Sequence, residues 1–409
     1  MMDGTIYIFA AYKFDSKYYK KEDLERAIKE AVKNIQTTLR KKFKGLTLQL
    51  IEQRQILPGE YVGEFVKNSL DKAMITIFDL SDREPNVTFE LGYSLGMAKY
   101  RFALQDGYDI LIQCDKVDPR DTISDLLGKF IVLYEYDSNS RQKDEYKKIQ
   151  RKIETELKRK VCNLLEDGRF LKRLVWRMYQ EKVYVICPYI PPADQERYGI
   201  RSSLAEYGDF NTVHEVCTFL KGTLNCDVKY FHIKAAKSMH DLFNNNLVIV
   251  GGPMWNDFTT EVIEDYNLPY QYIWDPQEDF EDYILDKINN KKYYTSKRKK
   301  NGEDIITADY GIFGVLPNKY AKGKVIVLIS GITSAGGLGA ARAFTEGEAS
   351  HQNCRSVVKT VGLKNYFITL VESDIRWDEF TYPKRVKKSM IFLYLYDQKE
   401  NLWRRPHEK

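Results

Sequence analysis

The first third of the chain alternates between continuous apolar runs and apolar residues at helical spacing. The runs are typical of strands buried on both faces of a parallel sheet. The spaced residues recur every three or four positions, as on one face of an amphipathic helix. The predicted strands cover 5–11, 46–51, 74–80, 110–113 and 131–134. The predicted helices cover about 24–39, 60–72 and 88–99. This alternation predicts an α/β domain with a parallel, helix-covered sheet.

The rest of the chain predicts a connecting helix and a second α/β domain. Residues 140–180 are highly charged but carry an apolar stripe, which predicts a long helix broken near Gly168. The apolar stripe could pack on its own domain or mediate self-association, and both interpretations stay open. A Rossmann-like α/β unit begins near Lys182, where apolar strand-like runs resume. The expected domains are 1–139, 140–181 and 182–409.

Charge, cysteine content and hydropathy narrow the class of protein. The 409 residues include 63 basic and 58 acidic ones, a balance that argues against a nucleic-acid partner. The six cysteines form no CxxC pair, so we expect no disulfide framework and a reducing, cytoplasmic location. No apolar run approaches the length of a membrane span. His214 and Cys217 lack a second ligand pair, so no metal site is expected.

The strongest chemical signal lies between Asp79 and Lys99. Asp79 ends a predicted strand, and ligands of parallel α/β sheets bind outside the carboxyl ends of the strands. Glu90 is predicted in the first turn of the next helix, where the helix dipole would keep it anionic against the effect of burial. A carboxylate beside a sugar stabilises or attacks the positive charge that develops when an N-glycosidic bond breaks.

Two interpretations of these residues remain open. In the functional one, Asp79 holds ribose hydroxyls or acts as an acid or base, and Tyr93 lines the pocket because it shares a helix face with Glu90. In the structural one, Asp79 and Asn86 cap the helix and Glu90 complements its dipole.

The segment resembles nucleoside 2-deoxyribosyltransferases and the related TIR-like nucleotide-binding domains of bacterial defence proteins. The resemblance covers about residues 4–136. It rests on Asp79, on Pro-Asn-Val at 85–87, on Glu-Leu-Gly at 90–92 and on the opening TIYIFAAYKF. It implies a flavodoxin-like sheet and an enzyme that acts on glycosidic bonds. Glu90 would be the nucleophile or cation stabiliser, and Asp79 the strand-end aspartate. The resemblance further implies that substrate is bound by Ala10, Ala11, Phe14, Asp82, Asn86 and Tyr93.

Two departures from these families bear on the reaction. The small-residue loop of the transferases is replaced by EPNVTF, which is closer to the TIR-like branch. The proline of the families' first loop is absent, with Tyr12 and Lys13 in its place. Both departures favour hydrolysis of a larger nucleotide such as NAD over deoxyribosyl transfer.

Two glycine loops mark the second domain. One follows the strand at 247–250 and the other follows the strand at 325–330, ahead of a helix rich in small residues. Such loops let a ligand approach the backbone, and a helix N-terminus attracts phosphate. The alternative is tight turns and close packing. Between the loops, a charged insertion over about 276–305 predicts a helix and a surface hairpin. The candidate residues for a regulatory ligand are Gly251, Gly252, Asn256, Gly331, Gly336 and Gly337.

The second domain also bears a loose likeness to Rossmann-like nucleotide-sensing domains. That likeness implies a nucleotide-like activator and an oligomeric, regulated enzyme. The leading hypothesis is an antiphage defence effector whose N-terminal N-glycosidase cleaves NAD or another nucleotide as substrate, with no other cofactor. The second is a deoxyribosyltransferase of nucleotide salvage. The third is a non-catalytic nucleotide-binding signalling protein.

Overall fold

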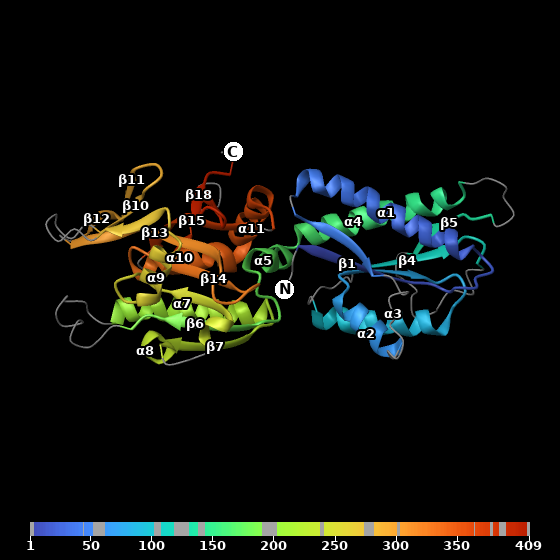
Figure 1. The fold of residues 1–409 in the computed structure, drawn as a ribbon, viewed down its shortest axis with the longest axis horizontal. Helices are drawn as coiled ribbons and strands as arrows, with labels where there is room; N and C mark the ends of the chain where they lie inside the picture. The colour runs from blue at the N-terminus through green and yellow to red at the C-terminus, as the bar shows by residue number, and fades with distance from the viewer. Residues whose placement is uncertain are drawn as a thin grey trace. The chain divides into compact units, whose positions relative to one another are not determined.

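The computed structural model divides the chain into two compact units, Gly4–Glu166 and Asp167–Lys409 (Figure 1). Each unit is an α/β structure, which confirms the predicted fold class. In the part of the chain that the structure describes, no helix combines the length and the apolar content needed to cross a membrane. The described residues are 4–43, 45–51, 62–101, 108–117, 131–137, 144–189, 203–237, 241–273, 282–300, 303–363, 365–376, 379–383 and 390–406.

The first unit is built on a five-stranded parallel sheet in the order β2-β1-β3-β4-β5. This is the flavodoxin-like order that the resemblance implies, and it reverses direction between β1 and β3. The apolar runs become buried strands because both faces of the sheet are covered. The strands are β1 (Thr5–Ala11), β2 (Thr47–Ile51), β3 (Ile75–Asp79), β4 (Asp109–Cys114) and β5 (Ile131–Tyr134).

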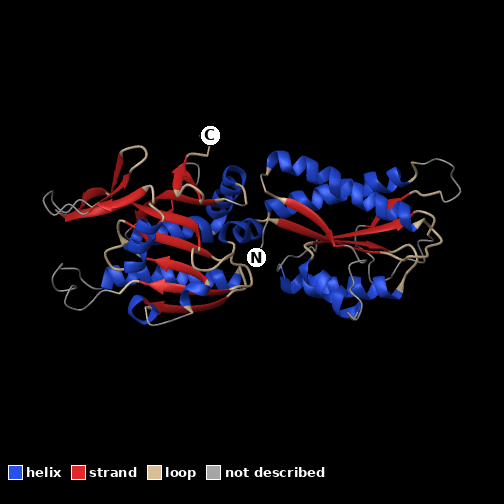
Figure 2. Cartoon of the chain, in the orientation of Figure 1, coloured by secondary structure: helices blue, strands red, loops and turns tan. Residues whose placement is uncertain are grey.

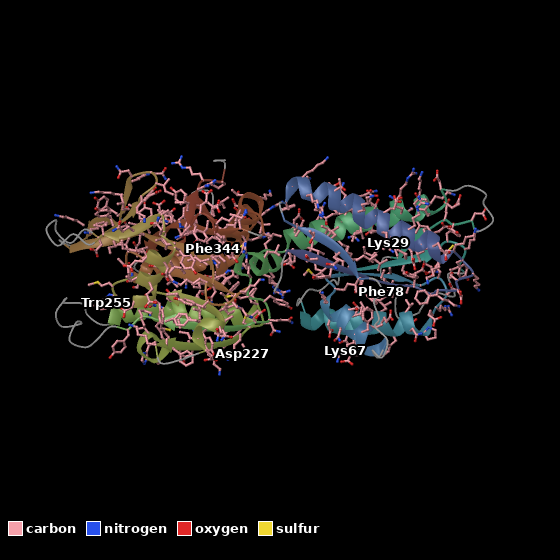
Figure 3. The ribbon with its side chains drawn as sticks, viewed as in Figure 1. Lys29, Lys67, Phe78, Asp227, Trp255 and Phe344 are labelled. Atoms are coloured by element: carbon pink, nitrogen blue, oxygen red, sulfur yellow. The ribbon has the colours of Figure 1, made fainter. Side chains whose placement is uncertain are left out.

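Helices cover both faces of this sheet (Figure 2). α1 (Lys21–Lys42) and α4 (Tyr146–Glu166) lie on one face. α2 (Val62–Lys72) and α3 (Pro85–Arg101) lie on the other. α1 and α4 bury the apolar stripes that their sequence periodicity predicts. Phe78 of β3 is fully buried, whereas Lys29 and Lys67 are exposed on the covering helices (Figure 3).

The segment 140–181 does not form a separate connector. Its first helix, α4, packs along α1 and belongs to the first unit. The apolar stripe of α4 is buried, with Ile149, Ile153 and Leu157 all 0% exposed, so it is not available for self-association. α4 ends at Glu166. The side chain of Asp167 accepts a hydrogen bond from the Arg169 N–H at 2.7 Å and caps the next helix.

The second unit contains a ten-stranded mixed sheet in the order β18-β17-β15-β13-β14-β8-β6-β7. β14, β8, β6 and β7 are parallel, as in half of a Rossmann-like sheet. β13, β15, β17 and β18 extend it with antiparallel pairs. The strands are β6 (Lys182–Cys187), β7 (Asp227–His232), β8 (Asn246–Val250), β12 (Ser296–Lys300), β13 (Glu303–Pro317), β14 (Val325–Gly331), β15 (Tyr366–Arg376), β16 (Glu379–Pro383), β17 (Met390–Asp397) and β18 (Leu402–Arg404).

The helices of the second unit pack on both faces of this sheet (Figure 1). Phe344 of α10 stacks on Phe313 of β13 at a ring-centroid distance of 3.9 Å, and both rings are fully buried (Figure 3). The helices are α5 (Gly168–Trp176), α7 (Ser203–Gly222), α8 (Ile233–Ala236), the 3-10 turn Leu242–Asn244, α9 (Asp257–Asp265), α10 (Ser334–Thr345) and α11 (Gly347–Val361).

The hairpin predicted in the charged insertion is confirmed. The predicted helix is not found among the described residues of the insertion. β10 (Tyr283–Asp286) and β11 (Lys291–Tyr294) form a hairpin that joins β9 (Tyr270–Ile273) in a small antiparallel sheet. Residues 274–281 and 301–302 lie outside the described part. The hairpin buries Ile284 and Tyr293 against the core, which explains why charged residues between them still form strands.

Candidate functional site

A cleft of about 1030 Å³ opens in the first unit beside the carboxyl ends of β1 and β3. Its walls are the loop after β1, the helix α2 and the first half of α3. This is the point where the strand order reverses, which is where sheets of this type bind ligands. Four predicted site residues line the cleft together: Phe14, Asn86, Glu90 and Tyr93.

Glu90 is the one buried carboxyl group among the described residues that line the cleft. Glu90 is only 9% exposed, and its Oε2 has no hydrogen-bond partner in the described part of the chain. Burial raises the pKa of this carboxyl to about 7. The other acidic residues at the cleft, Asp15, Glu64 and Glu84, are exposed or half-buried.

The expectation that the helix start keeps Glu90 anionic is wrong. α3 begins at Pro85, because proline suits the first position of a helix, and this puts Glu90 in the second turn. The dipole effect fades within the first turn, so desolvation dominates. Glu90 therefore gains or loses a proton near neutral pH.

The rim of the cleft combines cations and exposed aromatic rings. Lys13 lines it and lies 3.8 Å from Asp82, measured from Nζ to Oδ1. Phe14 is 50% exposed and Phe89 is 73% exposed. Tyr93 donates a hydrogen bond to Asp71 Oδ1 at 3.0 Å, which fixes its ring at the wall. Such a rim can stack a planar ring beside the buried carboxyl group.

Asp79 does not line the cleft, although it ends β3 as predicted. It is 4% exposed, and both of its oxygens accept hydrogen bonds at 2.7 Å, from Ser81 N–H and from Tyr134 O–H. Ser81 Oγ also accepts a bond from Cys114 N–H at 2.8 Å. Burial raises the pKa of Asp79 to about 6. Asp79 and Ser81 thus tie the ends of β3, β4 and β5 together.

The other predicted substrate-binding residues, Ala10, Ala11 and Asp82, are not among the residues that line the cleft. Ala10 and Ala11 are buried in β1 at 5% and 1% exposure, paired with Ile77 and Phe78, and neither lines the cleft. Asp82 faces Lys13 instead.

Lys13 and Phe89 contribute to the site but were not predicted. Both are direct chain neighbours of residues discussed above, and only the fold shows that their side chains also reach the cleft.

The start of α10, predicted to cradle an anion, is already occupied by a carboxylate of the protein. Asp309 of β13 is fully buried. Its Oδ2 accepts hydrogen bonds from the Thr333 N–H, the Thr333 hydroxyl and the Gly336 N–H at 3.1, 2.6 and 2.7 Å. The donors that a phosphate would need are thereby used, since each N–H supplies a single proton.

The glycines of this loop serve close packing. A Cβ on Gly331 would lie 2.2 Å from Gly337 N, and one on Gly336 would lie 2.4 Å from Tyr310 O. Gly337 has space, since its nearest neighbour atom would be 3.8 Å away. The backbone of α10 therefore sits directly on β13 and β14. This is the packing alternative of the sequence analysis.

The first glycine loop is likewise structural. Asn256 is fully buried and caps α9, with its Oδ1 accepting from Phe258 N–H and its Nδ2 donating to Val250 O at 2.8 Å. Gly251 has a φ of +101°, and a Cβ there would meet Pro188 at 3.0 Å. Gly252 O accepts from the Asn256 N–H at 3.0 Å. Its carbonyl thus helps to close the turn.

Within the described ranges, no group of three or more His, Cys, Asp or Glu side chains is placed to hold a metal ion. No family model matches the sequence, and the search of curated proteins gives no match either. The function is therefore argued from the cleft itself.

Proposed function

We propose that the first unit hydrolyses the N-glycosidic bond of NAD or a related nucleotide in the Glu90 cleft. The observation that carries the proposal is a buried carboxyl group with an unpartnered oxygen, in a cleft large enough for a dinucleotide. Unpaired buried carboxyl groups with raised pKa values are typical of functional sites. The topology supports the same place, because the cleft lies at the switch point of the sheet.

The chemistry needs a carboxylate and a good leaving group. The bond between C1′ and the pyridinium nitrogen breaks with its electron pair going to nitrogen, so nicotinamide leaves as a neutral molecule. Glu90 stabilises the positive charge on C1′ and O4′, or attacks C1′ directly. Water then supplies hydroxide to C1′ and releases one proton, which gives ADP-ribose.

The lack of a second buried carboxyl among the described lining residues favours a pyridinium substrate. Neutral purine nucleosides leave more easily when an acid protonates the base, and no buried acid other than Glu90 lines the cleft in the described residues. Nicotinamide needs no such proton. The positive charge of the pyridinium also favours the ionised form of Glu90, because an opposite charge lowers a carboxyl pKa.

The test is product analysis with the full-length chain. Wild-type protein, Glu90→Gln and Glu64→Gln are incubated with NAD, and nicotinamide and ADP-ribose are separated by chromatography. Glu64 is an exposed residue of the same cleft, so it provides a matched control. We expect Glu90→Gln to slow release of nicotinamide by about 10²–10³-fold, and Glu64→Gln to keep most of the rate. Equal rates in wild type and Glu90→Gln would refute the role of Glu90.

An exchange arm separates hydrolysis from transfer. Free adenine or a labelled pyridine base is added during the reaction, and the products are searched for an ADP-ribosyl adduct of that base, in which it has replaced nicotinamide. Hydrolysis gives nicotinamide and ADP-ribose with none of the added base incorporated, whereas a transferase gives the exchanged product.

A further inference from the structure

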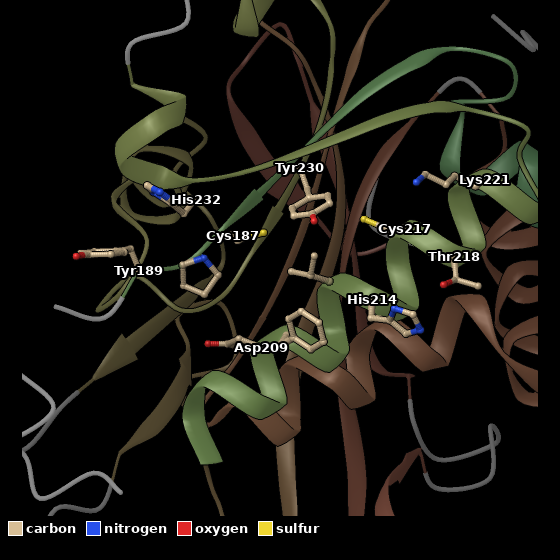
Figure 4. Close-up of a pocket in the computed structure, with 12 residues that line it drawn as sticks. Cys187, Tyr189, Asp209, His214, Cys217, Thr218, Lys221, Tyr230 and His232 are labelled. Carbon is tan, nitrogen blue, oxygen red and sulfur yellow. The ribbon is translucent and has the colours of Figure 1, made fainter. Parts of the chain in front are cut away.

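A second cavity lies wholly within the second unit, beside α7. It has a volume of about 550 Å³ and is lined by residues at the ends of β6 and β7 and along one face of α7 (Figure 4). β6 and β7 are parallel neighbours, and Cys187 and His232 form the last pair of their ladder. One end of the cavity thus lies at the carboxyl ends of two parallel strands, which is the usual place for ligands in such sheets, and from there the cavity runs along α7 to Lys221. We call it the α7 cavity.

Aromatic side chains from three segments surround the α7 cavity. Tyr189 follows β6, Phe210 and His214 stand on α7, and Tyr230 and His232 stand on β7. The rings of Phe210 and His214 lie within 13° of parallel, at a centroid distance of 6.5 Å. Phe210 and Tyr230 are each 65% exposed. Large aromatic rings this exposed, gathered on one concavity, are typical of binding surfaces.

Charged groups stand at the two ends of the cavity. Asp209 is half-buried near the end of β6, and Lys221 is exposed at the other end, with Tyr230 between them (Figure 4). The described residues show no hydrogen bond or ion pair for either side chain. Burial raises the pKa of Asp209 to about 7. The twelve-residue step from Asp209 to Lys221 corresponds to about 18 Å along the helix axis.

We propose that the α7 cavity binds a nucleoside monophosphate, with its base among the aromatic rings and facing Asp209, and its phosphate directed to Lys221. A planar base satisfies the ring faces. Ring or exocyclic N–H groups of the base donate to the carboxyl group of Asp209, and the phosphate pairs with Lys221. The volume suits a ligand of this size. This site is separate from the second glycine loop, where the Thr333 and Gly336 N–H groups already donate to Asp309.

The binding test uses the full-length chain carrying Glu90→Gln, which removes the proposed turnover of nucleotides. AMP, GMP, CMP and UMP are titrated by calorimetry. At least one should bind saturably, and Tyr230→Ala should weaken it about tenfold or more through lost stacking. Lys221→Ala should weaken the monophosphate but leave its nucleoside unchanged, because only the phosphate reaches the lysine. Tyr320→Ala and Lys322→Ala change exposed residues of the same unit elsewhere and should have no effect.

A chemical footprint keeps the test valid if a variant folds poorly. Cys217 lines the α7 cavity, whereas Cys162 is exposed on α4 of the first unit. Saturating nucleotide should slow alkylation of Cys217, read by peptide mass spectrometry, and leave Cys162 unchanged. Absence of binding by all four nucleotides at millimolar concentration would overturn the proposal. So would binding that neither cavity variant weakens and that does not protect Cys217, because the nucleotide would then occupy the Glu90 cleft. Neither result depends on whether the first unit cleaves NAD.

Discussion

At the residue scale, Glu90 is a carboxyl group that the fold makes costly to ionise. Its pKa rises from the ordinary value of 4.5 to about 7 on folding, so the folded chain holds a proton that the unfolded chain releases between these values. The contribution of Glu90 to the free energy of unfolding is therefore greatest below pH 4.5, and it is lost as pH rises through 7. Replacing Glu90 by glutamine removes that loss.

We predict that Glu90→Gln stabilises the first unit by about 3 kcal/mol more at pH 8 than near pH 4. The measurement is denaturant unfolding followed by circular dichroism at both pH values. All five tryptophans lie in 167–409, so tryptophan fluorescence follows the second unit and should show no change. A stability difference that does not vary with pH would mean that Glu90 is not desolvated.

The same titration should govern the proposed reaction. If the carboxylate is the reactive form, kcat/KM for NAD should rise as pH increases through about 7 and then level off. The measurement is nicotinamide release by wild type between pH 5 and 9, each value controlled for folding. A rate that falls over this range would instead assign Glu90 the role of a proton donor.

At the scale of elements, Gly336 and Gly337 are neighbours at the start of α10, but they differ in the space that a side chain would find. A Cβ on Gly336 would clash with Tyr310 O at 2.4 Å, while one on Gly337 would meet nothing closer than 3.8 Å. We predict that Gly336→Ala costs the second unit about 3 kcal/mol or more, because backbone must move. Gly337→Ala should be neutral or slightly stabilising, as alanine favours helix.

The readout for this pair is tryptophan-monitored unfolding. Equal effects of Gly336→Ala and Gly337→Ala would show that α10 does not rest on β13 as described.

The elements also show what the sequence pattern can and cannot predict. Continuous apolar runs marked β1 and β3 correctly, because strands buried on both faces require them. The start of α3 was placed three residues late, although Pro85 was a usable signal. β13 was missed because its first half is polar, and it is held by antiparallel partners that no local pattern identifies. For the same reason, the contact of Asp309 with α10 could not be predicted.

At the scale of the whole molecule, the candidate site draws on one unit only. The residues that line the Glu90 cleft lie between Tyr12 and Tyr93, all within Gly4–Glu166. The sequence identified Glu90 through its motif and Phe14 through the resemblance. It gave Asp79 a ligand contact that the hydrogen bonds to Ser81 and Tyr134 do not allow. Strand ends predict where a site lies, but not which side chains turn inward to brace the sheet.

The division of the chain supplies the last prediction. Because α4 covers α1, the fragment 1–166 should fold by itself, with a cooperative thermal transition and dispersed amide resonances. The fragment 1–139 should not, because α1 would lose the helix that packs along it and would expose apolar surface. If the second unit restrains the first, 1–166 should also release nicotinamide at least as fast as the full chain. An unfolded 1–166 would show that the first unit depends on the second for stability, whereas a folded but slower fragment would show that the second unit assists the reaction.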